Sequence, residues 1–136
     1  SREGSSTLIE HAHEEGAIVV ASFHDFEATP SDERLAEVLA AMNVAGADVL
    51  KFACMAHSAT DAARVLAAQA WAREAYDRPI IGISMGQHGA PTRLVGSALG
   101  SAATFATLPG WEGSAPGQFT VEQVRAVLDI VEGAGI

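Results

Sequence analysis

Short apolar runs alternate with longer amphipathic stretches along this chain. The apolar runs are rich in β-branched residues and have the length of buried strands, whereas apolar residues between them recur at helical spacing. We expect strands at residues 17–22, 48–55, 79–85 and 102–108. We expect helices at residues 5–15, 29–45, 60–75, 92–99 and 121–132. One helix followed by four strand–helix pairs indicates parallel strands with right-handed crossovers, in a single domain covering 1–136.

Two α/β architectures accommodate this order of elements: a small doubly wound sheet, and half of an eight-stranded (β/α)8 barrel. Both folds carry their chemistry at the C-terminal ends of the strands. Polar and special residues gather at those ends, namely His24, Asp25, Lys51, Ser84, Met85, Gly86 and Thr107. No Gly-rich phosphate loop follows the first strand, where the chain reads SFHDFEATP, and this favours the half-barrel.

The net charge of the chain excludes some classes of binding partner. Seventeen acidic against eight basic residues give a net charge of −9, which repels nucleic acid and anionic membranes, so we expect neither as a partner. The apolar runs are too short to span a bilayer, and no basic leader opens the chain. The single cysteine cannot form an internal disulfide and suits a reducing compartment, so we expect a cytoplasmic protein. A small anionic substrate would need a local cation.

Lys51 is the only lysine of the chain, and it lies in the apolar stretch DVLKFACM. A lysine is rarely buried in a strand without a partner or a task, and a desolvated amine is a nucleophile toward carbonyl groups. The alternative is a lysine that reaches solvent from the strand end or pairs with an acid. The absence of any other lysine favours a function.

His24 and Arg93 are the next candidates. If the first two strands are parallel neighbours, His24 faces the same mouth as Lys51, where a histidine exchanges protons near neutral pH. Alternatively, His24 is a structural residue tied to Asp25 or to the backbone. Arg93 begins a helix after the loop GQHGAPT and is suited to binding a carboxylate with two hydrogen bonds, or it is a plain surface arginine.

The loop GSAPGQ precedes the last helix and carries Ser114 and Gln118, which offer neutral hydrogen bonds to substrate hydroxyls. Most loops of this composition are connectors only. The remaining histidines do not have the spacing of metal ligands, so we expect no metal. These are His11, His13, His57 and His88.

Four segments, in order, resemble the type I 3-dehydroquinate dehydratases of the shikimate pathway, which serves aromatic amino-acid biosynthesis. They are SFHDFEATP, GADVLKFACM, ISMGQHGAPTRLVGSALGSAATFATL and GSAPGQ. The resemblance implies a lyase in which Lys51 forms a Schiff base with the ketone of 3-dehydroquinate and His24 is the general acid and base. It also implies that Arg93 holds the substrate carboxylate.

The same resemblance implies that Ser114 and Gln118 bind substrate oxygens and that Met85 and Phe105 line the pocket wall. It implies no external cofactor. The family's members are complete (β/α)8 barrels, and this chain resembles their second half, with about four β/α units. We therefore expect a separately supplied N-terminal half or a homo-oligomer that closes the barrel, unless the chain is a fragment.

Two other functions stay open from the residues. A Schiff-base aldolase with the same barrel would also use a strand lysine, although it would more often need a phosphate site, and the GSAPGQ loop favours the dehydratase. A non-catalytic half-barrel that serves assembly is the second, because His24 and Lys51 can persist without a complete site.

Overall fold

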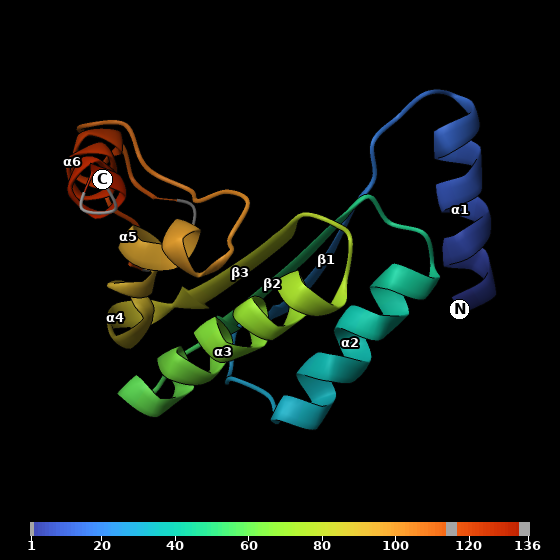
Figure 1. The fold of residues 1–136 in the computed structure, drawn as a ribbon, viewed down its shortest axis with the longest axis horizontal. Helices are drawn as coiled ribbons and strands as arrows, with labels where there is room; N and C mark the ends of the chain where they lie inside the picture. Colours follow the sequence, from blue (N-terminus) through green and yellow to red (C-terminus); the bar gives the residue numbers. More distant parts are fainter. Residues whose placement is uncertain (1, 114–116, 134–136) are drawn as a thin grey trace.

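The computed structural model describes residues 2–113 and 117–133, with side chains from residue 4 onward. Its centre is a sheet of three parallel strands in the order β1-β2-β3 (Figure 1). The strands are β1 (Val20–Asp25), β2 (Val49–Met55) and β3 (Ile80–Met85). The long helices α2 (Asp32–Val44) and α3 (Ala59–Ala75) lie side by side along one face of the sheet.

The remaining helices lie at the two ends of the molecule. Helix α1 (Arg2–Glu14) precedes β1 and stands at one end (Figure 1). At the other end, β3 is followed by α4 (Gly86–Gly89), α5 (Thr92–Val95), the 3-10 helix η1 (Gly96–Leu99) and α6 (Val121–Gly133). The alternation of parallel strands and helices predicted from the hydrophobic pattern is confirmed.

Hydroxyl side chains start the two long helices. Ser31 Oγ accepts a hydrogen bond from the Arg34 N–H at 3.2 Å, and Ser58 Oγ accepts one from the Asp61 N–H at 3.1 Å. Each bond satisfies one of the free N–H groups that a first helical turn leaves without an intrahelical partner. Gly46 ends α2 at φ +90°, a conformation in which a side chain would be strained.

Strand β2 is buried on both faces, as the central strand of a parallel sheet should be. Toward the helices, Leu50, Phe52 and Cys54 have no exposed surface and pack against the apolar faces of α2 and α3. Residues from β2 and β3 form a second cluster on the opposite face, namely Ala53, Ile81, Ile83 and Met85, with Val49 and Met55 packed against it. Lys51 belongs to this second face.

The predicted fourth strand at 102–108 is wrong for the described structure. The chain touches the edge of β3 once, where the Ala102 N–H donates to the Ile80 carbonyl at 2.7 Å, and then leaves it. The next group on this edge, the Gly82 N–H, donates to the side chain of Gln69 at 3.0 Å. A side chain from α3 thus takes the hydrogen bond that would continue a parallel ladder.

Candidate functional site

The strand register places His24 and Lys51 on one face of the sheet. Ser22 is paired with Lys51 and His24 with Ala53, and side chains two residues apart on a strand share a face. His24 therefore lies diagonally across from Lys51, one step nearer the C-terminal ends of the strands. This is the face opposite to α2 and α3.

A cavity of about 140 Å³ opens on this face. It contains four of the five site residues predicted from the sequence, because β1, β2, α5 and the segment before α6 each contribute one. The lining residues are His24, Phe26, Lys51, Ala53, Ile83, Met85, Arg93, Phe105 and Gln118. The fifth predicted residue, Ser114, lies outside the described residues.

Lys51 is half-buried, and its Nζ lies 4.5 Å from the centroid of the Phe105 ring. The negative face of an aromatic ring attracts a cation, so Phe105 holds the amine at the cavity wall. The lysine thus lines the cavity together with Phe105 and stays partly exposed.

His24 is an exposed side chain whose ring stacks on Phe26, with centroids 5.7 Å apart and an interplanar angle of 6°. Asp25 does not fix it: the Asp25 carboxylate accepts hydrogen bonds from the backbone N–H groups of Glu27 and Ala28, both at 3.0 Å. Asp25 shapes the loop after β1, and the stacked phenyl ring orients the imidazole from one side.

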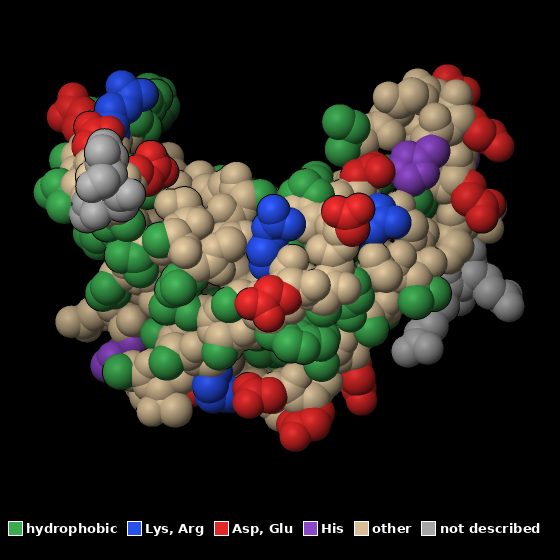
Figure 2. Space-filling view, in the orientation of Figure 1, with side chains coloured by type: hydrophobic (Ala, Val, Ile, Leu, Met, Phe, Trp, Pro, Cys, Tyr) green, Lys and Arg blue, Asp and Glu red, His purple; other side chains and the backbone are tan. Residues whose placement is uncertain are grey.

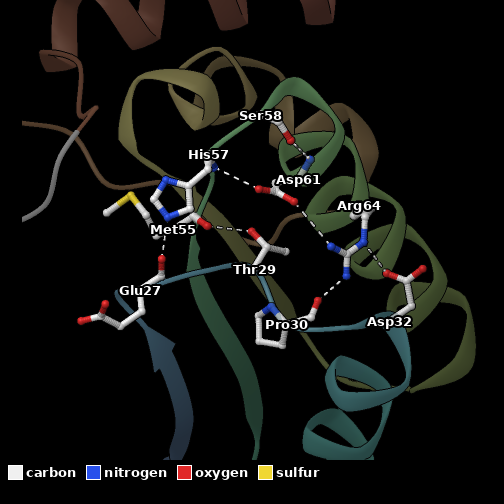
Figure 3. Close-up of polar contacts among 9 residues, drawn as sticks. All are labelled: Glu27, Thr29, Pro30, Asp32, Met55, His57, Ser58, Asp61 and Arg64. Atoms are coloured by element: carbon white, nitrogen blue, oxygen red, sulfur yellow. Dashed lines mark hydrogen bonds and ion pairs between the residues drawn. The ribbon is translucent and has the colours of Figure 1, made fainter.

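A group of polar contacts ties the loop after β1 to the loop after β2 (Figure 3). His57 Nε2 donates to the Glu27 carbonyl at 2.5 Å, and the Thr29 hydroxyl donates to the Met55 carbonyl at 2.8 Å. The two loops follow the strands that carry His24 and Lys51. Their connection fixes the two C-terminal strand ends relative to each other.

Arg64 continues these contacts from α3. Its guanidinium donates to the Pro30 carbonyl, pairs with Asp32 at 2.9 Å and lies 3.5 Å from Asp61 (Figure 3). Asp61 in turn accepts the His57 N–H at 3.0 Å. The start of α2 is thereby held on α3 by charge-assisted bonds, which are stronger than neutral ones.

Arg93 is the second basic side chain of the cavity, beside Lys51. It is 6% exposed, and burial lowers the pKa of its guanidinium from the ordinary value. Arginine nevertheless keeps its charge in proteins. An anion that enters the cavity would replace part of the solvation that the guanidinium loses by burial. Arg93 is therefore suited to bind an anion inside a protein whose net charge is −9.

Gln118 reaches the cavity because the chain before α6 packs closely on α4. Gly117, at φ +80°, leaves no room for a side chain, since a Cβ there would lie 2.7 Å from the Gly86 carbonyl oxygen. Two backbone bonds of Thr107, from its N–H to Phe119 at 2.8 Å and from the Val121 N–H at 2.9 Å, hold the segment in place.

The lining residues that the sequence analysis missed are Phe26, Ala53 and Ile83. Ala53 and Ile83 could not be predicted as cavity residues. Their strands are apolar on both faces, so the sequence has no alternation of apolar and polar residues that would show which face each side chain occupies. For Phe26 a signal existed, because it lies two residues after His24.

Cys54 faces the other side of the sheet, and burial, more than the nearby Asp25 charge, raises the pKa of its thiol to about 12.

None of the described residues form a group of three or more that would hold a metal ion. No helix in the described part of the chain is both long enough and apolar enough to cross a bilayer.

His13 donates a hydrogen bond to the Asp48 carboxylate at 2.8 Å and so connects α1 to the start of β2.

Comparison with known proteins connects this geometry to one family. The model of a family described as type I 3-dehydroquinase matches residues 1–134. The chain is 44% identical over 124 residues to the 3-dehydroquinate dehydratase of Listeria welshimeri, covering 91% of this chain and 48% of that protein. It is 41% identical over 125 residues to the Klebsiella pneumoniae protein of the same name, covering 91% and 49%.

Comparison with solved structures points to the same family. The 3-dehydroquinate dehydratase of Geobacillus kaustophilus superimposes with a TM-score of 0.91 at 37% identity, covering 96% of this chain and 50% of that one. The type I enzyme of Clostridium difficile gives a TM-score of 0.88 at 34% identity, covering 98% and 52%. These relatives are (β/α)8 barrels, and the chain spans about half the length of each, which confirms the predicted fold class. The chain belongs to the type I 3-dehydroquinase family.

Proposed function

We propose that this chain carries the catalytic lysine and histidine of a lyase that converts 3-dehydroquinate to 3-dehydroshikimate by removing water. The observation that carries the proposal is the cavity that brings Lys51, His24 and Arg93 together. Those three groups are a nucleophile for a ketone, a proton carrier and a cation for a carboxylate. Such a reaction belongs to the shikimate pathway.

In this proposal, Lys51 as the free amine attacks the substrate ketone, a C–N bond forms, and the ketone oxygen leaves as water. The resulting protonated imine withdraws electrons, so the neighbouring C–H loses its proton more easily. The electron pair of that bond forms the new C=C bond while the β-hydroxyl leaves as a second water. Hydrolysis of the imine consumes one water, so one is released in total.

His24 would move the protons of these steps. It takes the proton from the carbon next to the imine and delivers one to the departing hydroxyl, which is general acid–base catalysis near neutral pH. Its exposed ring, stacked on Phe26, borders the cavity that contains the Lys51 side chain. Gln118 and Ser114 would bind substrate hydroxyls.

We further propose that an N-terminal half-barrel docks against β1. Among the described strands, β1 pairs only with β2, so its other edge is open. Beside this edge lies a groove of about 520 Å³ between α1, β1 and α2, lined mainly by apolar groups such as Ile9, Ala21 and Met42. Val20 and Val44 are also exposed, at 50% and 85%. Figure 2 shows the molecule hollowed between the end with α1 and the end with α6.

A complementation experiment tests both proposals. The chain is co-expressed with the N-terminal half of the Listeria welshimeri relative, and formation of the conjugated enone product from 3-dehydroquinate is followed by ultraviolet absorbance. We expect turnover to be about 100-fold higher with the added half than without it, because the half supplies further positioned substrate contacts. Absence of turnover in both samples would contradict the function. Equal turnover with and without the added half would contradict the proposal that an N-terminal half-barrel is the partner. A mass that shows a homodimer of this chain would also contradict it.

Arg93→Ala is expected to raise KM for 3-dehydroquinate about 10- to 100-fold while changing kcat little. The reason is that a charge-assisted bond to a carboxylate contributes roughly 1.5–3 kcal/mol to binding. Steady-state kinetics of the complemented enzyme measure this. Arg125→Ala, which removes an exposed arginine from α6, is the matched control. An unchanged KM in the Arg93 variant would remove its role in binding.

A further inference from the structure

A glutamine lies in the apolar stripe with which α3 packs on the sheet. The buried positions of this helix are Ala62, Val65, Gln69 and Ala72. Gln69 has no exposed surface. Burying a carboxamide destabilises a protein unless its hydrogen bonds are satisfied, so its presence in this stripe needs a reason.

The Gln69 carboxamide joins three segments. Its Oε1 accepts the Gly82 N–H of β3 at 3.0 Å. Its Nε2 donates to the carbonyls of Gly96 and Leu99, both at 3.1 Å. Those carbonyls are the first and last of η1. Both N–H groups of the amide are therefore used on one short helix.

Gly82 makes this approach possible. A Cβ at this position would lie 2.7 Å from Gln69 Oε1 and 2.9 Å from Cζ of Phe52, closer than atoms pack. Gln69 and Gly82 therefore form a matched pair, in which the missing side chain on β3 admits the amide from α3.

The helix that Gln69 anchors is continuous with the one that carries Arg93. Arg93 lies in α5, and η1 begins at Gly96, directly after α5 ends. On the other side, the Thr104 hydroxyl donates to the Arg93 carbonyl at 3.1 Å. Two side chains from outside this helical segment therefore bind its backbone: Gln69, earlier in the chain, through two bonds to η1, and Thr104, later in the chain, through one bond to Arg93.

We propose that Gln69 is a positioning residue for Arg93: its carboxamide fixes α5 and η1 against β3, and thereby sets where the guanidinium enters the cavity. The inference rests on the proposed function, in which Arg93 binds the substrate carboxylate. Gln69 itself does not line the cavity.

Gln69→Met tests this, because methionine is of similar length and makes none of the three bonds. In the complemented enzyme we expect KM for 3-dehydroquinate to rise about tenfold with kcat nearly unchanged, as a small displacement of a binding group would cause. In the Arg93→Ala background, the same change should have no further effect on KM. Val65→Ala, at a buried position one turn earlier in α3, is the control for general destabilisation.

A second measurement does not depend on turnover. In the NMR spectrum of the free chain, Gln69→Met should shift or broaden the Arg93 Nε–H signal. The Arg64 Nε–H signal, whose group pairs with Asp32 at 2.9 Å, should stay in place and report that α3 is intact. Val65→Ala should leave the Arg93 signal unchanged.

The outcomes separate the two proposals. An unchanged Arg93 signal, or a Gln69→Met effect on KM that adds fully to that of Arg93→Ala, would overturn the positioning role. If the wild-type chain turns over no 3-dehydroquinate with its complementary half, the proposed function fails, and the NMR comparison still decides whether Gln69 positions Arg93.

Discussion

Replacing Lys51 by alanine is expected to lower turnover of 3-dehydroquinate by at least about 10⁴-fold, because the covalent route is lost together with its nucleophile. The structure offers no substitute, since Lys51 is the only lysine in the chain. The fold should survive, because the side chain is half-buried and its contact is with the ring of Phe105 at the cavity wall. Steady-state kinetics of the complemented variant measure the loss.

Lys51→Arg is the matched control for this experiment. It keeps a cation beside Phe105, but a guanidinium does not form an imine with a ketone under these conditions. We therefore expect the arginine variant to be as inactive as the alanine variant. Substantial turnover in Lys51→Arg would show that the positive charge, and not the amine, is what the reaction requires.

Replacing His24 by alanine is expected to lower kcat by about 10²–10⁴-fold, the contribution of a positioned general acid or base. The amine of Lys51 remains, so the imine should still form and a reduced adduct should still be trapped. Stability should change little, because His24 is exposed and its described ring contact is the stacking on Phe26. The variant thus separates imine formation from the later proton transfers.

His88→Ala provides the comparison, since His88 is an exposed histidine on α4 and does not line the cavity. Its turnover should stay close to that of the unmodified chain. Equal turnover of the His24 and His88 variants would assign the proton transfers to another group. Failure of His24→Ala to form any adduct would instead place histidine in the carbonyl addition.

The hydrophobic pattern placed β2 and β3 correctly because both are largely buried, but it misplaced β1, whose residues are exposed or half-buried. The run of β-branched residues suggested 17–22, whereas the pairing of Val20 with Val49 sets the actual β1 three residues later. The residues before it act differently: the Val19 carbonyl accepts the N–H groups of Asp48 and Val49, which orients the entry into β2. Register depends on the partner strand, which a local pattern does not contain.

The fourth strand failed for a reason that no local pattern could reveal. Whether 102–108 pairs with β3 depends on Gln69, a residue more than 30 positions earlier, whose side chain occupies the Gly82 N–H. The helix expected at 92–99 has the predicted bounds, but only its first half is α-helical. Its second half is the 3-10 helix η1, and Gln69 also binds two of the η1 carbonyls.

The candidate site was partly predictable. Parallel alternation alone predicted that His24 and Lys51 lie on neighbouring strands at one mouth. His24 is near the C-terminal end of β1, whereas Lys51 lies inside β2, and the register brings the two to the same face. Arg93 and Gln118 were candidates from their loops, and the resemblance to a known family added Phe105 and the expected substrate contacts. The loop contacts through His57 and Arg64 were not predicted, because they join residues about 30 positions apart and carry no spacing signal.

Trapping of the imine decides whether Lys51 is the nucleophile. The chain, with its complementary half, is incubated with 3-dehydroquinate and reduced with borohydride, and its mass is measured before and after digestion. Because the chain has a single lysine, the account predicts one adduct, carried by the peptide that contains Lys51 and absent from Lys51→Arg. No adduct in the folded protein, or an adduct that persists in Lys51→Arg, would contradict it.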